Sequence, residues 1–356
     1  MSTFLIADMK QGFSIVICTY NGTSRLAPTL AHVAALAVPT AYAVELIVVD
    51  NASTDDTAAF VAEQWQALGN PFPLQLLPEP RPGKGYAVET GYDATHYPHL
   101  LTVDDDNWLQ ADYLLVAAEL LRQNPEIGVL QGQSSAVMEV APPDWFEQVK
   151  WYFAVGEPKP RVGFFAPHDF YVWGAGMIIR RADWVRLREL GFSALTSKLP
   201  GKAAGEDNEV AIGLVLLRCR IYYSEKLRYQ HYMPKERVSW EKSQHNFDTF
   251  GYVRYHLFLY ETVTECFRSQ RPVTAAYVTR AFARFCVRAR REFTLKHHVG
   301  YLLWHRQDLY QLRLHQYYAM LKWFWKLRKR AKADIAHIQH WMLPLLRENP
   351  DFRWFY

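Results

Sequence analysis

Residues 13–21 read FSIVICTYN, an apolar run rich in β-branched side chains that ends in a polar turn. Such a run predicts a short buried β-strand. Similar runs recur at 45–50 (ELIVVD), 74–77 and 99–103, and each is followed by a polar turn and a helical pattern. Strands that alternate with helices across short turns are typical of an α/β protein with a mostly parallel sheet flanked by helices.

Polar side chains gather where these predicted strands end. They are Thr19, Tyr20 and Asn21 after the first strand, Asp50 at the end of the second, and Asp104, Asp105 and Asp106 after the fourth. Open α/β sheets bind their ligands beyond the carboxyl ends of the strands. We therefore expect these side chains to share one site.

Three adjacent carboxylates, Asp104 to Asp106, repel one another unless a cation or water offsets their charge. Carboxylates two residues apart at a strand end can bind one hard divalent cation, and oxygen ligands suit Mg²⁺ or Mn²⁺. A solvated turn that caps the following helix would explain the same residues. The acids alone leave both interpretations open.

The loop 82–85 (PGKG) places Lys84 between two glycines, where it would reach a phosphate or a sugar. It is no Walker A loop, because Pro78 stands where the first glycine is required and Gly85 where Ser or Thr is required. No G-x-G-x-x-G follows the first strand, which argues against a dinucleotide-dependent dehydrogenase. A simple turn remains the alternative for this loop.

The composition excludes several classes of protein. The chain has 356 residues, of which 50% are hydrophobic and 21% charged, so neither a disordered chain nor a stapled miniprotein fits. Its four cysteines form no C-x-x-C pair, which favours a reducing compartment. We see no secretory signal and no run near the roughly 20 apolar residues of a spanning helix. The expected location is the cytoplasm, either free or peripheral on the inner face of the membrane.

Charge divides the chain into two parts. Residues 1–240 carry 20 Lys and Arg against 27 Asp and Glu, whereas residues 241–356 carry 20 against 9. An irregular segment at 140–204 predicts a pocket wall, and the run 221–224 predicts an edge strand. After residue 245 the pattern predicts helices near 247–268, 272–292 and 306–340. We predict an α/β domain over 1–245 and a basic, aromatic helical region over 246–356.

Five segments together resemble the family 2 glycosyltransferases. They are 13–21 (FSIVICTYN), 48–56 (VVDNASTDD), 83–91 (GKGYAVETG), 102–109 (TVDDDNWL) and 205–209 (GEDNE). The resemblance covers about residues 13–240 and implies the GT-A fold, a UDP- or GDP-type nucleotide-sugar donor and inverting, metal-dependent transfer to a sugar or lipid-linked hydroxyl acceptor. Surface polysaccharide, lipopolysaccharide or glycolipid synthesis is the expected setting.

The resemblance also implies roles for individual residues. Those at the donor would be Thr19, Tyr20, Asn21, Asp50, Gly83, Lys84, Gly85, Asp104 and Asp105. Asp104 and Asp106, the D-x-D pair, and His231 would hold Mn²⁺ or Mg²⁺. Asp207 would be the general base, and the acceptor side would include Trp173, Gly176, Glu206, Arg237 and Trp240.

The chemistry supports one base and one metal site. Transfer to an alcohol needs a base beside the hydroxyl and charge neutralisation on the departing diphosphate. Glu206 and Asp207 are adjacent, so they are a poor pair for a hydrolase. An acidic first helical turn is the alternative for these two residues. Arg237 and Trp240 only loosely match the Q-x-x-R-W signature of processive members, which favours transfer of a single sugar.

Residues 314–332 combine an aromatic stripe with a basic flank. Six Lys and Arg lie at 322, 326, 328, 329, 330 and 332. Such a helix would lie on an anionic membrane, or it would pack its stripe on the catalytic domain. A nucleic-acid-binding protein is an alternative function, although the acidic first part makes nucleic acid an unexpected partner. A sugar nucleotidyltransferase is the other alternative, although it would need a glycine-rich loop after the first strand.

Overall fold

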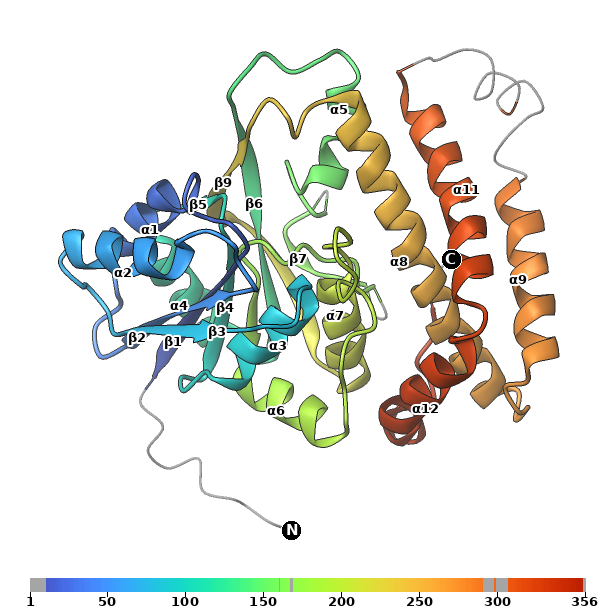
Figure 1. Cartoon of the computed structure of the whole chain (residues 1–356). Helices are drawn as coiled ribbons and strands as arrows, with labels where there is room; N and C mark the ends of the chain where they lie inside the picture. The colour runs from blue at the N-terminus through green and yellow to red at the C-terminus, as the bar shows by residue number, and fades with distance from the viewer. Residues whose placement is uncertain (1–10, 160, 167–168, 291–297, 299–306, 355–356) are drawn as a thin grey trace, which may run out of the picture.

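The computed structural model describes residues 11–159, 161–166, 169–290, 298 and 307–354. Within them a sheet of nine strands has the order β3-β2-β1-β4-β8-β6-β9-β5, and β7 pairs with β9. The strands are β1 (Gly12–Thr19), β2 (Ala43–Asp50), β3 (Leu74–Pro78), β4 (His99–Asp104), β5 (Asn107–Leu109), β6 (Ile127–Met138), β7 (Gly163–Phe164), β8 (Ile178–Arg180) and β9 (Arg220–Met233). Helices cover the sheet and a helical block lies beside it (Figure 1).

The first four strands form the parallel half of the sheet. β1 lies between β2 and β4, and β2 pairs with β3, all in parallel. The register pairs Thr19 with Asp50 and Cys18 with Asp104, so the polar strand ends lie at one edge. The predicted α/β sheet flanked by helices is therefore confirmed.

Alternation along β1 divides the core between the two faces of the sheet. Val16 belongs to one buried cluster with α3 (Lys84–Asp93), α6 (Arg181–Glu189) and α7 (Glu206–Leu216). Ile15 and Ile17 belong to another with α1 (Leu26–Ala34), α2 (Thr57–Ala67) and α4 (Tyr113–Gln123). Burial on both faces explains why the strand reads as a continuous apolar run.

The other half of the sheet is mixed, because β8 runs antiparallel to both β4 and β6. The sequence pattern predicted only an edge strand at 221–224, but β9 extends to Met233 and pairs with β6 on one side and β5 and β7 on the other. The charged residues 225, 226 and 228 interrupt the apolar pattern of β9, so its extension beyond residue 224 was not apparent from the sequence. A register irregularity against β6 lies at this point.

The C-terminal helices are α8 (Trp240–Arg268), α9 (Ala275–Arg290), α11 (Leu309–Leu327) and α12 (Ala331–Glu348). In Figure 1, α8, α9 and α11 stand side by side next to the sheet domain, and α12 lies at their lower end. One buried cluster runs from Val16 of β1 through α8 to Leu346 of α12, so these helices share a core with the sheet. The predicted border at residue 245 falls inside α8, and the single helix predicted at 306–340 is broken at 328–330.

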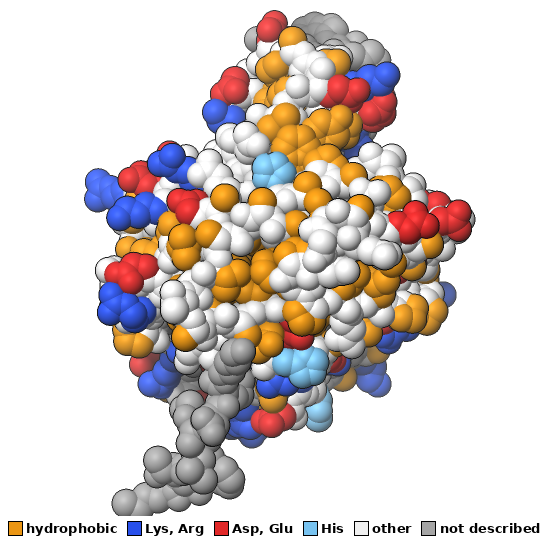
Figure 2. Space-filling model, turned by 90° about the vertical axis from the view of Figure 1, so that its left-hand side faces the viewer, with side chains coloured by type: hydrophobic (Ala, Val, Ile, Leu, Met, Phe, Trp, Pro, Cys, Tyr) orange, Lys and Arg blue, Asp and Glu red, His pale blue; other side chains and the backbone are white. Residues whose placement is uncertain are grey.

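The aromatic stripe on α11 packs against its neighbours. Phe324 stacks on Phe282 of α9 with ring centres 3.6 Å apart, and Trp323 meets Tyr252 of α8 edge-on. Trp325 is the exception, with 66% of its surface exposed. Within the described residues, no helix has both the length and the apolar character needed to cross a membrane. On the α1–α2 side, acidic and basic side chains are scattered without one large patch of either sign (Figure 2).

Candidate active site

The three adjacent acids at the end of β4, Asp104 to Asp106, contact three different partners. Asp104 accepts from Lys84 Nζ at 2.8 Å, in α3. Asp105 Oδ2 accepts from Thr19 Oγ1 and from the Arg25 guanidinium, each at 2.7 Å. Asp106 forms an ion pair with Arg237, beyond β9. Each carboxylate thus has its own cation, which offsets the repulsion expected between neighbouring acids.

Lys84 links the sheet edge to α7. Its Nζ lies 3.2 Å from Glu206 Oε1 as well as beside Asp104. Burial alone would lower the pKa of Lys84, but the carboxylates of Asp104 and Glu206 outweigh that effect and raise it well above its usual value. This lysine therefore remains a cation and joins the strand-end acids to the Glu206–Asp207 pair.

Asp207 lies in the first turn of α7, where its carboxylate is held by backbone and side-chain donors. Oδ2 accepts from Gly174 N at 2.9 Å, and Oδ1 accepts from the backbone and side-chain nitrogens of Asn208, each at 2.7 Å. Burial, followed by the charge of Glu206, raises the pKa of Asp207 to about 7. A carboxyl with such a pKa can accept a proton near neutral pH.

The loops after β1 and β2 are joined by hydrogen bonds. Asn21, in a left-handed conformation with φ of 50°, donates from its backbone N to Ser53 Oγ at 2.9 Å. Its Oδ1 accepts from Thr54 N at 2.8 Å, and Asp50 Oδ1 accepts from Ser53 N at 3.2 Å. Tyr20 is 52% exposed at this edge. Thr19, Tyr20, Asn21 and Asp50 thus lie together at this edge of the sheet.

Asn51 holds the glycine loop, a role that the sequence pattern did not reveal. Its Nδ2 donates to Arg81 O at 2.7 Å, and its Oδ1 accepts from Gly83 N at 2.9 Å. Gly83 has φ of 139°, and a Cβ there would lie 2.8 Å from Ser197 O. Gly85 N donates to the same oxygen at 2.9 Å. The two glycines therefore allow a close approach between α3 and the segment around residue 197.

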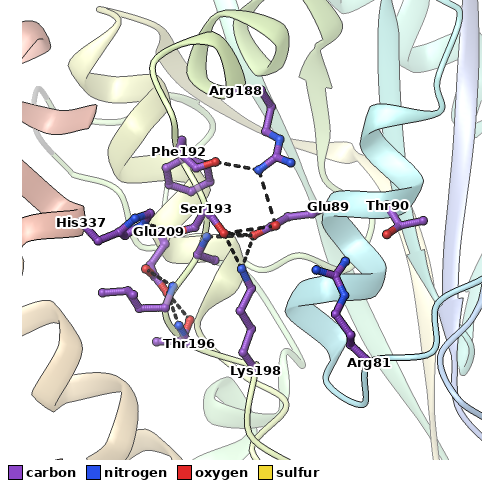
Figure 3. A network of polar contacts seen from close by, with 12 residues as sticks. Arg81, Glu89, Thr90, Arg188, Phe192, Ser193, Thr196, Lys198, Glu209 and His337 are labelled. Atoms are coloured by element: carbon purple, nitrogen blue, oxygen red, sulfur yellow. Dashed lines mark hydrogen bonds and ion pairs between the residues drawn. The ribbon is translucent and has the colours of Figure 1, made fainter. Parts of the chain in front are cut away.

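Two buried glutamates hold residues 193–198 from opposite sides (Figure 3). Glu89 of α3 accepts from Ala194 N at 2.9 Å and from Lys198 Nζ at 2.7 Å. Glu209 of α7 accepts from Leu195 N at 2.8 Å, and also from Thr196 N. This part of the irregular segment is thereby fixed beside the site, and Ser197 Oγ donates to Glu206.

His231 is the predicted metal ligand on β9. Its side chain is 2% exposed, and Nε2 lies 3.4 Å from Asp106 Oδ1. Among the residues that the structure describes, neither ring nitrogen has a hydrogen-bond partner. No three His, Cys, Asp or Glu side chains within the described ranges are grouped closely enough to hold an ion. Arg237 instead neutralises Asp106, and it lowers the pKa of that carboxyl together with His231, against the effect of burial.

The predicted acceptor-side residues are more scattered. Trp173 is only 7% exposed, and its backbone N and O pair with the side chain of Gln131, each at 3.0 Å. Gly176 is buried in the turn before β8. Trp240 begins α8 and packs edge-on against Trp145 at 5.5 Å. Arg237 contacts Asp106 rather than an open surface.

The sheet order and the acidic strand ends agree with the GT-A type of α/β fold that the sequence resemblance implied. Residues 14–186 match the family model described as glycosyl transferase family 2. The chain therefore contains a family 2 glycosyltransferase domain, as the five sequence segments predicted. This match favours the glycosyltransferase prediction over the nucleic-acid-binding and nucleotidyltransferase alternatives.

Relatives and solved structures agree with this assignment. An uncharacterized glycosyltransferase of Mycobacterium tuberculosis is 39% identical over 85 residues, which are 24% of this chain and 34% of the relative. The crystal structure of S. aureus TarS has a TM-score of 0.52 at 18% identity and covers 94% of this chain and 54% of that one. TarS 1-349 in complex with UDP-GlcNAc has a TM-score of 0.50 at 17% identity, with 98% and 93% covered. At these identities the structures show the shared fold alone.

Proposed function

We propose that this protein transfers one sugar from a nucleotide-sugar donor to a hydroxyl acceptor, with inversion at the anomeric carbon. One observation carries the proposal: Lys84 joins the strand-end carboxylate of Asp104 to the Glu206–Asp207 pair. Asp207, whose pKa is about 7, is adjacent in sequence to Glu206. The Lys84 cation links Glu206 to the strand end that is expected to bind the donor. The UDP-GlcNAc complex of TarS, which shares the fold, supports a donor of the UDP type.

In this mechanism Asp207 accepts the proton of the attacking hydroxyl. The bond from the acceptor oxygen to the anomeric carbon forms as the bond to the diphosphate breaks, and the proton moves to Asp207 Oδ. A single base gives direct displacement and hence inversion. A positioned base contributes on the order of 10²–10⁴-fold to such a reaction. The bonds from Gly174 and Asn208 fix the orientation of the carboxylate.

We propose a divalent cation at Asp104, Asp106 and His231. The buried imidazole of His231, whose ring nitrogens make no hydrogen bond within the described residues, suits such a site. The side chains are not grouped closely enough in this structure to hold the ion, so Lys84 would have to leave Asp104 and Arg237 would have to leave Asp106 as it binds. An imidazole nitrogen beside carboxylates suits Mn²⁺ better than Mg²⁺, which prefers oxygen ligands alone. When bound, the ion would neutralise charge on the diphosphate. Removal with EDTA should abolish transfer and Mn²⁺ should restore it, whereas full activity in EDTA would contradict the site.

We further propose that the turn after α11 touches an anionic surface that carries the acceptor, in surface polysaccharide or glycolipid synthesis. The support is the exposed Trp325, with Arg328 stacked 4.3 Å from its ring centre, among exposed basic side chains. Flotation with vesicles rich in anionic lipid should recover the protein at low salt, and neutral vesicles should not. Equal recovery with both would count against this contact.

Replacement of the base tests the main proposal. Asp207→Asn keeps the shape of the side chain but removes its basicity, so transfer should fall by at least about 10²-fold while UDP binding stays nearly unchanged. Nuclear magnetic resonance of the product's anomeric configuration would report inversion. Asp112→Asn, at the N-cap of α4, is a control in which activity should remain. Full activity of Asp207→Asn would show that Asp207 is not the general base.

A further inference from the structure

An exposed tryptophan lies next to the turn that holds Asp207. Trp151 is in the short 3-10 helix Lys150–Phe153 and is 40% exposed. Its ring centre is 5.8 Å from that of Trp173. The residue after Trp173 is Gly174, whose backbone N donates to Asp207. Only one buried ring therefore separates Trp151 from the peptide that orients the base.

The segment that carries Trp151 is fixed in place. Gly156 N and O bond to the backbone of Ser134 in β6, each at 3.0 Å, and Ser134 Oγ donates to Ala154 O at 2.5 Å. Val149 and Phe153 are buried in one cluster with Met233 and Val238. The backbone that carries Trp151 is therefore ordered before a ligand binds, so little conformational entropy is lost on binding.

The same segment borders both halves of the candidate site. The cluster residues Met233 and Val238 lie on either side of Arg237 in sequence, and Arg237 pairs with Asp106. On its other side the segment meets Trp173, beside Asp207. The acceptor hydroxyl must reach Asp207 next to the donor, so this segment is placed to contact the rest of the acceptor.

We propose that Trp151 is the platform on which the acceptor's pyranose ring stacks, which makes the acceptor a glycoside rather than a plain lipid alcohol or a polyol. The inference rests on the proposed function and adds the substrate class. The C–H bonds on one face of a pyranose form an apolar surface that matches an indole ring, while its hydroxyls remain free to meet Asp207. Trp173, which the sequence suggested for this role, is too buried to offer its face.

The experiment measures UDP release from UDP-GlcNAc in the presence of Mn²⁺, first in water alone and then with p-nitrophenyl glucoside, galactoside or N-acetylglucosaminide. Glycerol serves as an acceptor that has a hydroxyl but no ring. In the wild type a glycoside should accelerate release above the rate in water, and glycerol should not. For Trp151→Ala we expect KM for that glycoside to rise about tenfold with water-driven release unchanged, because an aromatic stack contributes this order of affinity.

Two further variants separate the possible results. Trp151→Phe keeps an aromatic face and should stay within about threefold of the wild-type KM. Leu115→Ala removes an apolar side chain of α4 that is 41% exposed, close to the 40% of Trp151, and should leave KM unchanged. An unchanged KM in Trp151→Ala would contradict the proposed stacking of the acceptor on Trp151. Acceleration of UDP release by glycerol but by none of the glycosides would contradict it as well. Absence of any UDP release by the wild type would instead contradict the proposed function.

Discussion

Replacing Lys84 by Met would remove the cation that joins the two halves of the candidate site. Its Nζ lies 2.8 Å from Asp104 Oδ1 and 3.2 Å from Glu206 Oε1. Met has a similar length, so the packing of the side chain is largely kept. The substitution leaves two carboxylates facing each other without compensation, and it removes a positive charge close to Asp207.

The size of the effect follows from burial. Removing one partner of a fully buried ion pair costs about 3–5 kcal/mol, and exposed pairs contribute about 0–1 kcal/mol. The side chains of Lys84 and Asp104 are each 25% exposed and that of Glu206 is 6% exposed. A loss of about 2–3 kcal/mol in the free energy of unfolding lies between these limits. The pKa of Asp207 should also rise, because Lys84 lowers it.

Urea unfolding and pH–rate profiles test both effects. Lys84→Met should unfold at lower urea, and the acid limb of its profile should move to higher pH, whereas Lys84→Arg should keep most of both properties. Lys150→Met breaks an exposed pair with Glu147, where the side chains are 42% and 70% exposed, and should change stability by less than about 1 kcal/mol. Equal urea midpoints for Lys84→Met and the wild type, or an unmoved acid limb, would refute this reasoning.

Two other predictions concern the base and the helical block. Because the raised pKa of Asp207 keeps it protonated in acid, the wild-type rate should increase as pH rises through about 7 and level off above it, and two units below the midpoint the rate should be about a hundredfold lower. A rate independent of pH between 5 and 8 would contradict the assigned base. Gly251→Ala should destabilise the protein by about 1–3 kcal/mol in thermal unfolding, because its Cβ would lie 2.6 Å from Ala319 Cβ between α8 and α11. An unchanged midpoint would show that these helices can separate freely.

The first strands could be predicted because burial on both faces and a polar strand end leave a local signal. β9 left this signal only at 221–224, because the charged residues 225, 226 and 228 interrupt its apolar pattern where its pairing with β6 is irregular. The break between α11 and α12 was missed for a related reason. The turn consists of three consecutive basic residues at 328–330, which also occur within helices. Neither Gly nor Pro marks the end of α11.

The site was harder to predict than the strands because its contacts are distant in sequence. The position of the acids after β4 indicated a site, but their partners lie far away along the chain: Thr19 is 86 residues from Asp105, and Arg237 is 131 residues from Asp106. Asn51 and Glu89 act through bonds to loop backbone, which depend on the sheet order rather than on any local motif. The exposure of Trp151 and the burial of Trp173 likewise follow from tertiary packing, so sequence alone could suggest an aromatic wall but not the exposed ring.

The charge balance of the site has a consequence for donor binding. Three acids after β4 meet three cations, one each from α3, the loop before α1 and the segment beyond β9. Glu206 shares the Lys84 cation, so four carboxylates meet three cations around the described site, and Asp207 adds a fifth carboxylate when it is ionised. A diphosphate would bring further negative charge to this edge, where like charges repel strongly. A divalent cation would offset that repulsion, and so its omission should weaken donor binding itself rather than only slow the chemical step.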